Sequence, residues 1–181
     1  MAKLTIIVGM GGSGKSHLCD EITSSQNAFS FKDATLTNCD RRRAGYDCLG
    51  EIVARLLLRN ENCVMDEAHL TNEDFRRTFK SFCGEFLKGV EQEWVFFEND
   101  ALGCINTVYS EVTTKSRVEC SRFESLANQI PNYKVPEPGS YPGYAKPRPV
   151  FQQSSPHFHR EADALEWLHS EIKRLESERC R

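Results

Sequence analysis

Residues 9–16 match the phosphate-binding pattern G-x-x-x-x-G-K-[ST] at every position. An apolar, β-branched run at residues 4–8 precedes this loop, and Leu18 and Ile22 follow it with the four-residue spacing of a helix face. A strand, a glycine-rich loop and a helix form the context that such a loop needs. The segment constrains the fold strongly, because it requires a buried strand that leads through the loop into a helix N-terminus.

The composition of this loop predicts a nucleoside-triphosphate site. Glycines let the backbone approach phosphate oxygens and turn its N–H groups toward them, and the positive end of the following helix favours the same anion. Lys15 is expected to reach the β- and γ-phosphates, and the Ser16 hydroxyl to hold Mg²⁺. The residues expected to bind ATP are Gly9, Met10, Gly11, Gly12, Ser13, Gly14, Lys15 and Ser16.

Apolar strand-like runs alternate with helix-like runs along the chain. This alternation predicts an α/β protein with the three-layer fold of phosphate-loop NTPases, a mainly parallel sheet with helices on both faces. Further strands are expected at residues 28–31, 63–65 and 94–97, and amphipathic helices near residues 49–57, 71–86, 100–112, 123–130 and 161–181. A row of phenylalanines on one of these helices is interpreted as core packing: Phe75, Phe79, Phe82 and Phe86.

The length of 181 residues suits one α/β domain, so we expect a single domain over residues 1–181. A lid is expected at about residues 113–130. A stretch rich in Pro, Gly and Tyr follows at residues 131–156, and it is long enough that we expect it to be functional or packed on the domain. The net charge of −3 argues against a large, salt-sensitive nucleic-acid footprint.

The composition also indicates a cytoplasmic protein with no membrane partner. The apolar run before Gly9 spans five residues, which is too short for a signal peptide or a transmembrane helix. The eight cysteines include no C-x-x-C pair, so neither a structural zinc site nor a disulfide framework is indicated. Several cysteines fall on apolar faces, and we expect them to be reduced core residues.

A second acidic element follows the phosphate-binding loop by about fifty residues. Asp66 ends the apolar run at residues 63–65, and the carboxyl end of a buried strand is where ligands bind in doubly wound sheets. Asp66 is therefore expected to hold Mg²⁺ opposite Ser16. The alternative is that Asp66 or Glu67 caps the following helix. Residues 66–69 also spell a helicase box, but the chain is too short for the second motor domain that such helicases need.

With these residues in place, the segment from residue 4 to residue 138 resembles the phosphate-loop kinases of the polynucleotide kinase and zeta-toxin group. The resemblance rests on the loop, on Asp-Glu-Ala-His-Leu-Thr-Asn at residues 66–72 followed by Arg76 and Arg77, and on the strand, helix and arginine-bearing lid of residues 94–122. His69 and Leu70 stand where Asn-Leu is usual in that group, with one extra residue.

The resemblance implies a kinase that transfers the γ-phosphate of ATP to a hydroxyl-bearing acceptor. Nucleic-acid 5′-hydroxyls, modified nucleosides and small metabolites are the acceptors considered. It also implies lid arginines that stabilise the transferring phosphoryl group, and the matching candidates are Arg117 and Arg122. The alternative for both arginines is a solvated charged turn between two helices.

The family also carries a carboxylate after its second strand that accepts the proton of the attacking hydroxyl. Two residues compete for this catalytic role, and the spacing from the loop does not decide between them. Asp33 directly follows the strand at residues 28–31, while Asp40 precedes three arginines at residues 41–43 that could grip a phosphate-bearing acceptor. The alternative for these three arginines is an exposed helix start. We favour Asp33 slightly, because strand ends point at the site.

A competing hypothesis is an ATPase or nucleotide-dependent switch, in which Glu67 polarises water as the phosphoryl acceptor. A GTPase is disfavoured, because no N-K-x-D guanine-reading motif follows Asp66.

Residues 147–151 are expected to border the adenine, by analogy with this fold. His157 and His159 lie in a loop-like region without a nearby third ligand, and we interpret them as surface residues.

Overall fold

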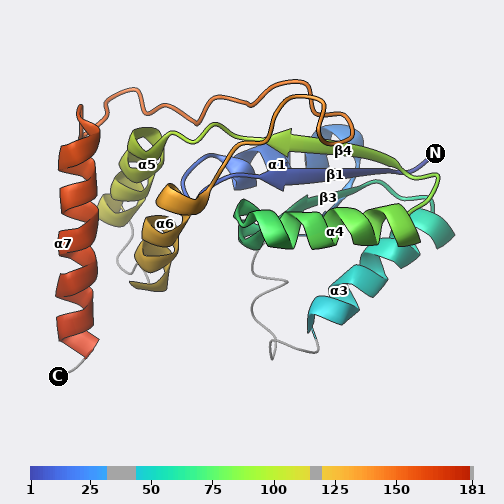
Figure 1. Cartoon of the computed structure of the whole chain (residues 1–181), viewed down its shortest axis with the longest axis horizontal. Coiled ribbons are helices and arrows are strands. Elements are labelled where there is room, and N and C mark those ends of the chain that lie inside the picture. The colour runs from blue at the N-terminus through green and yellow to red at the C-terminus, as the bar shows by residue number, and fades with distance from the viewer. Residues whose placement is uncertain (32–43, 115–119, 180–181) are drawn as a thin grey trace.

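The computed structural model describes residues 1–31, 44–114 and 120–179. These residues form a parallel four-stranded sheet with the order β2-β3-β1-β4 (Figure 1). The strands are β1 (Lys3–Val8), β2 (Phe29–Phe31), β3 (Cys63–Asp66) and β4 (Glu91–Phe96). The strand expected at residues 63–65 thus includes Asp66 as its last residue. The predicted α/β class and mainly parallel sheet are confirmed.

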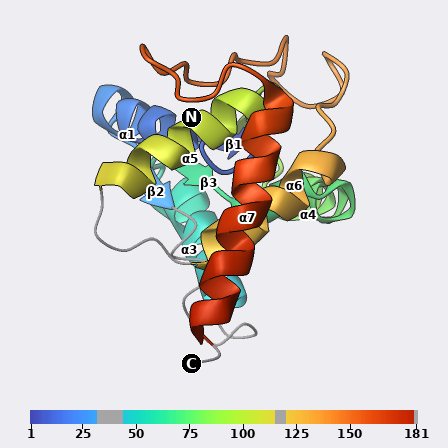
Figure 2. The ribbon, with the colours of Figure 1, turned by 90° about the vertical axis from the view of Figure 1, so that its left-hand side faces the viewer.

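Helices cover both faces of the sheet and also stand beyond its carboxyl edge. The helix α1 (Lys15–Gln26) packs on one face, and α4 (Glu73–Phe86) packs on the other. The other helical elements that the described residues form before α4 are α3 (Ala44–Val53), the π-helical η1 (Ala54–Leu58) and the 3₁₀-helical η2 (Ala68–Thr71). Beyond the carboxyl ends of the strands stand α5 (Ala101–Thr114), α6 (Cys120–Asn132) and α7 (Glu161–Arg179), as Figures 1 and 2 show.

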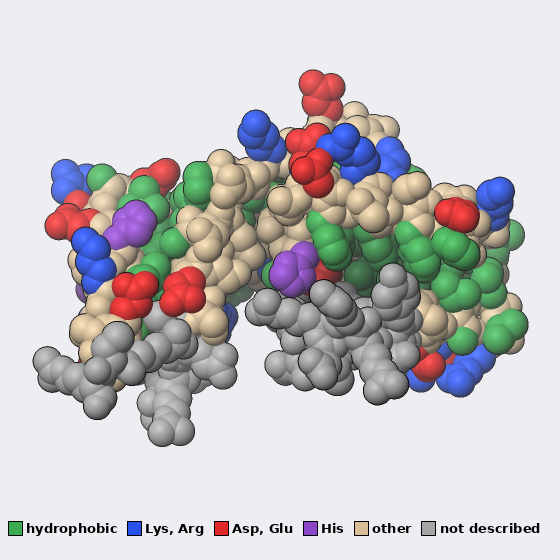
Figure 3. Space-filling view, turned by 60° about the horizontal axis from the view of Figure 1, so that its bottom comes forward, with side chains coloured by type: hydrophobic (Ala, Val, Ile, Leu, Met, Phe, Trp, Pro, Cys, Tyr) green, Lys and Arg blue, Asp and Glu red, His purple; other side chains and the backbone are tan. Residues whose placement is uncertain are grey.

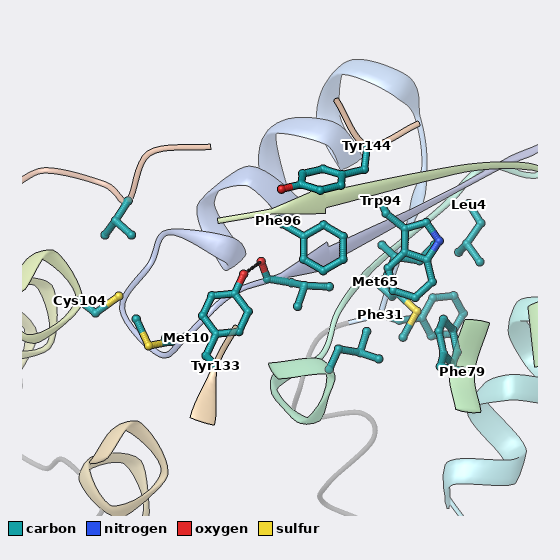
Figure 4. Packing of buried hydrophobic residues seen from close by; sticks show 14 of the residues in the cluster. Leu4, Met10, Phe31, Met65, Phe79, Trp94, Phe96, Cys104, Tyr133 and Tyr144 are labelled. Atoms are coloured by element: carbon teal, nitrogen blue, oxygen red, sulfur yellow. Dashed lines mark hydrogen bonds between the residues drawn. The ribbon is translucent and has the colours of Figure 1, made fainter. Parts of the chain in front are cut away.

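The strand β1 is buried on both faces, which is why its sequence is apolar throughout rather than alternating. Ile7 packs with Leu18 and Ile22 of α1, whereas Ile6 and Val8 belong to the larger core on the opposite face. Figure 4 shows the aromatic part of that larger core. Each fully buried aliphatic side chain contributes roughly 1.5–3 kcal/mol to folding. This packing fixes the end of β1, and therefore the start of the phosphate-binding loop.

The proline-rich segment packs along the edge of β4, which is one of the two arrangements expected for it. The Trp94 N–H donates to the Pro142 carbonyl at 2.9 Å, and the Arg148 N–H donates to the Phe96 carbonyl at 2.7 Å. Phe97 and Arg148 form a single parallel bridge. Pro147 and Pro149 flank this bridge and lack an N–H group, so a longer ladder does not form. The segment starts later than expected, because α6 extends to Asn132.

The row of phenylalanines on α4 is core packing only in part. Phe79 is buried, but Phe75 and Phe86 are 46% and 52% exposed. Figure 3 shows one face of the molecule on which hydrophobic side chains, in green, reach the surface. In the first turn, Arg76 rather than Phe75 occupies the core-facing position, and it donates hydrogen bonds to the carbonyls of Leu70 and Thr71, both at 2.8 Å. A pattern of apolar residues does not reveal an arginine that is satisfied by backbone carbonyls.

The cysteines within the described residues behave as small core residues, as expected. Cys19, Cys63, Cys83 and Cys104 are buried, and none of these four is in a disulfide. Burial raises the pKa of Cys104 to about 12, and Lys15 opposes that rise only in part. Cys104 therefore stays protonated near neutral pH and is a poor nucleophile. None of the helices in the described parts is long and apolar enough to cross a bilayer.

Candidate functional site

The phosphate-binding loop joins the end of β1 to α1, and its backbone requires glycine. Gly12 and Gly14 have φ angles of 81° and 99°, in the left-handed region that other residues rarely adopt. A Cβ atom on Gly12 would lie 2.4 Å from the Cys104 carbonyl oxygen of α5. A Cβ atom on Gly9 would lie 2.9 Å from the Cβ of Phe97. Both α5 and the end of β4 therefore touch the loop directly.

Ser16 and Asp66 meet at the first turn of α1. The Ser16 hydroxyl donates a hydrogen bond to Asp66 Oδ2 at 2.9 Å. Lys15 Nζ lies 3.9 Å from Asp66 Oδ1 and donates to the Met10 carbonyl at 3.1 Å. The sheet brings Lys15 and Ser16 close to Asp66, because β1 and β3 are neighbouring strands and Ile7 pairs with Asp66. Lys15 and Asp66 are 6% and 1% exposed, so this charge pair lies in a largely desolvated position.

Two buried oxygens of this region make no hydrogen bond with the described residues: Asp66 Oδ1 and Ser13 Oγ. An unsatisfied buried polar group costs about 1–3 kcal/mol, so such atoms suit a ligand. Carboxylate and hydroxyl oxygens are the donors that Mg²⁺ prefers. In the described parts of the chain, no cluster of three or more His, Cys, Asp and Glu side chains is arranged to hold a metal. The donor set thus fits a magnesium ion that takes its other ligands from phosphate and water.

Glu67 has a different place from its neighbour Asp66. Its Oε1 accepts a hydrogen bond from the His69 N–H at 3.0 Å, so the side chain caps η2. The alternative of helix capping therefore applies to Glu67, whereas the Asp66 carboxylate lies beside the phosphate-binding loop. Glu67 is also buried.

A cavity of about 330 Å³ opens beside the loop. Its walls come from the start of α1, from α5, from α6 and from the proline-rich segment. The lining side chains outside the loop are His17, Thr107, Glu111, Arg122, Phe151 and Gln153. The Phe151 N–H donates to the Ser13 carbonyl at 3.2 Å, and its ring makes an edge contact with His17 at 6.3 Å. The expectation that residues 147–151 reach the nucleotide site is thus compatible with the position of Phe151.

Arg122 lies on α6 and lines this cavity. Its Nη2 is 2.5 Å from Glu111 Oε2 of α5, so its guanidinium has an acidic partner. The other candidates from the sequence lie outside the described residues. They are Asp33, Asp40, the arginines at residues 41–43 and Arg117.

Some residues at the site carry no recognisable sequence signal. Gln129 of α6 accepts a hydrogen bond from the Gly11 N–H at 2.8 Å, through its Oε1. The Tyr133 hydroxyl donates to the Phe97 carbonyl at 2.7 Å, at the end of β4. Neither residue belongs to a motif, and the contacts arise from the packing of α6. His157 and His159 are exposed, as expected, and His157 stacks on Tyr109 at 4.0 Å.

Comparison with known proteins places the fold. No protein-family model matches the chain, and no curated protein matches it in sequence. Among solved structures, it is similar to a gluconokinase from Sinorhizobium meliloti 1021, with a TM-score of 0.56 and 15% identity over 96% of this chain and 93% of that one. It is also similar to a proposed kinase from Chloroflexus aurantiacus j-10-fl, with a TM-score of 0.50 and 13% identity over 95% of this chain and 96% of that one.

These likenesses establish a phosphate-loop, kinase-like α/β fold for this chain. They do not carry an activity, since unrelated functions share such folds. The narrower resemblance to the polynucleotide kinase and zeta-toxin group stays a prediction.

Proposed function

We propose that the protein is an ATP-dependent kinase that transfers the γ-phosphate of ATP to a hydroxyl acceptor. The observation that carries the proposal is the meeting of Lys15, Ser16 and Asp66 at the carboxyl ends of β1 and β3. The adjoining cavity of about 330 Å³ supports it, because the cavity gives the rest of a nucleotide a place beside the loop. The loop itself, residues 9–16, would hold the phosphates.

The chain's own groups account for most of the binding. The first N–H groups of α1 lack partners within the helix, and they would donate to phosphate oxygens. Lys15 would exchange the Met10 carbonyl for the β- and γ-phosphates. Ser16 and Asp66 would hold Mg²⁺, which neutralises phosphate charge when bound. Arg122 would turn from Glu111 toward the γ-phosphate, with α6 as part of a lid at about residues 113–130.

The transfer would be a nucleophilic displacement at the γ-phosphorus of ATP. The acceptor oxygen forms a bond to the γ-phosphorus while the bond from that phosphorus to the β–γ bridging oxygen breaks, so ADP leaves. The acceptor proton would pass to a carboxylate, for which Asp33 and Asp40 are the candidates from the sequence. Phe151 and His17, which line the cavity and contact each other, would border the adenine.

The acceptor class is the finer part of the proposal. The family resemblance favours a nucleic-acid 5′-hydroxyl or a nucleoside. The structural likeness to a gluconokinase adds a sugar acid to the acceptors worth testing. The competing hypothesis of transfer to water needs Glu67 to polarise that water. Its Oε1 accepts the His69 N–H, so the carboxylate is held in place as the cap of η2.

The test is turnover of γ-labelled ATP with Mg²⁺ against 5′-hydroxyl oligonucleotides, nucleosides, gluconate and other polyols. Lys15→Ala removes a proposed phosphate contact, and Lys88→Ala, an exposed lysine next to the amino end of β4, is the matched control. We expect label on one acceptor class with the wild type and the control, and its loss with Lys15→Ala. Label released only as inorganic phosphate, whatever acceptor is added, would replace the kinase with the ATPase.

A further inference from the structure

One face of α6 follows the phosphate-binding loop from the cavity to the strand ends. Arg122, Leu126 and Gln129 succeed one another at helical spacing along this face. Tyr133 follows directly after the helix, and its N–H still donates to the Gln129 carbonyl at 2.7 Å. Arg122 lines the cavity, and Leu126 Cβ lies 4.0 Å from where a Cβ atom on Gly11 would be. The last two side chains make the polar contacts to the loop and the strand ends. The helix that carries the candidate lid arginine is therefore also the one that holds the loop.

The contact between Gln129 and Gly11 is specific in its geometry. The Gln129 side chain is mostly buried at 9% exposure, and its Oε1 accepts the Gly11 N–H at 2.8 Å. Its Nε2 donates to the Ser125 hydroxyl at 3.1 Å, one helical turn earlier, and this second bond fixes which way the amide points. The amide of Gly11 is thereby bonded to a side chain 118 residues away.

We propose that Gln129 is a positioning residue that holds the phosphate-binding loop in its binding conformation and ties it to α6. The inference rests on the proposed function, since it concerns the same nucleotide site. A loop with glycine at positions 11, 12 and 14 has many accessible backbone conformations, so a fixed shape needs external contacts. Gln129 supplies one such contact to the loop, although its side chain would not touch the nucleotide itself.

Tyr133 makes this tie rigid at its other end. Its hydroxyl donates to the Phe97 carbonyl at 2.7 Å and lies 3.5 Å from the Val8 carbonyl (Figure 4). Burial raises the pKa of Tyr133, so the hydroxyl stays a donor at any physiological pH. The carboxyl-terminal part of α6 is thus fixed to the ends of β1 and β4, whereas its first turn carries Arg122. A shift of the loop on nucleotide binding would reach Arg122 through this one helix.

The test uses variants that separate the effect of the hydrogen-bond acceptor of Gln129 from the effect of the size of its side chain. Gln129→Met keeps the length and removes the acceptor, whereas Gln129→Glu keeps an acceptor. Asn128→Met, on an exposed neighbouring position, is the control. The first readout is amide hydrogen exchange of the loop in the nucleotide-free protein, and the second is the Kd for Mg·ATP by calorimetry. Ser125 is exposed, so we expect Ser125→Ala to leave the fold intact. The substitution removes the hydrogen bond that orients the Gln129 amide without altering Gln129 itself.

We expect Gln129→Met to speed exchange at Gly11 and to weaken Mg·ATP binding about tenfold, as the loss of one buried hydrogen bond predicts. Gln129→Glu should retain the Gly11 protection, and Ser125→Ala should show a smaller effect than Gln129→Met in the same direction. Wild-type exchange at Gly11 in both Gln129→Met and Ser125→Ala overturns the inference. If the wild type binds no nucleotide, the proposed function fails, while the exchange data still decide whether Gln129 holds the loop.

Discussion

Ser16 and Asp66 are joined by a hydrogen bond of 2.9 Å although fifty residues separate them in the chain. The bond exists because β1 and β3 are adjacent parallel strands, so the residue that ends β3 lies beside the loop that follows β1. This adjacency brings a carboxylate and a hydroxyl into direct contact beside the loop. It is the geometry that the magnesium role requires.

The variant Asp66→Asn tests that role. The amide oxygen can still accept from Ser16, but the negative charge that would hold Mg²⁺ is gone. We expect the fold to persist and phosphotransfer to fall roughly 100-fold or more, as on loss of a strong electrostatic contact to the reacting phosphates. The measurement is kcat/KM over a range of Mg²⁺ concentrations. Turnover equal to that of the wild type at low Mg²⁺ would exclude Asp66 as a metal ligand.

Gly12→Ala is expected to destabilise the protein, whereas Gly11→Ala is not. At Gly12 a Cβ atom meets a backbone oxygen at 2.4 Å and φ is 81°, while at Gly11 the nearest atom is 3.8 Å away. The left-handed conformation and the clash together cost about 2–4 kcal/mol. For a chain of this size, that lowers Tm by roughly 4–16 °C. Equal Tm values for the two variants, from thermal unfolding, would show that the loop does not pack on α5 as described.

The loop, its flanking strand and helix, and the Asp66 position were all predictable from sequence, because each depends on a short motif or on local apolar spacing. The exposure of Phe75 was not, because the core-facing place is taken by Arg76, whose hydrogen bonds run to the carbonyls of Leu70 and Lys134. The Gln129 contact was not either, since it depends on how α6 packs 118 residues from the loop. Local patterns specify elements, and packing between elements specifies such side-chain partners.

The buried thiols predict a loss of stability at alkaline pH. Burial raises the pKa of Cys83 and of Cys104 to about 12, and that of Cys63 to about 11. Above the ordinary thiol pKa of about 8.5, the unfolded chain releases these protons while the folded chain keeps them. The unfolded state then binds fewer protons, so the free energy of unfolding falls as pH rises. Urea titrations between pH 8 and pH 10.5 should show this decline.

A variant with one buried thiol removed gives the check on that assignment. Cys83→Ala should lower stability at pH 7, because it leaves a small cavity, but should also flatten the alkaline decline. An unchanged slope between pH 8 and pH 10.5 would mean that other groups cause the decline.

Arg122→Met tests whether the arginine of α6 acts on the phosphates. In the nucleotide-free protein Arg122 pairs with Glu111, so its removal costs little stability for a partly exposed pair. We expect kcat to fall by about 100-fold while the Kd for Mg·ATP changes less, since the charge would act mainly in the transition state. Arg174→Met on α7, which pairs with Glu171 and Glu178, is the matched control. A fall in kcat equal to that of the control would remove Arg122 from the mechanism.

Phe151→Ala tests the nucleoside side of the cavity. Phe151 is half exposed, its ring contacts His17, and its N–H is fixed to the Ser13 carbonyl, so the loop backbone holds it at the mouth of the site. Loss of a stacking ring should weaken ATP binding by about tenfold, in line with roughly 1–3 kcal/mol per stacked base. Binding of inorganic tripolyphosphate should stay unchanged, because it carries no base. Phe29→Ala, a comparably exposed ring on β2, is the control. If calorimetry gives the same loss for ATP and for tripolyphosphate, Phe151 supports the loop and does not contact the adenine.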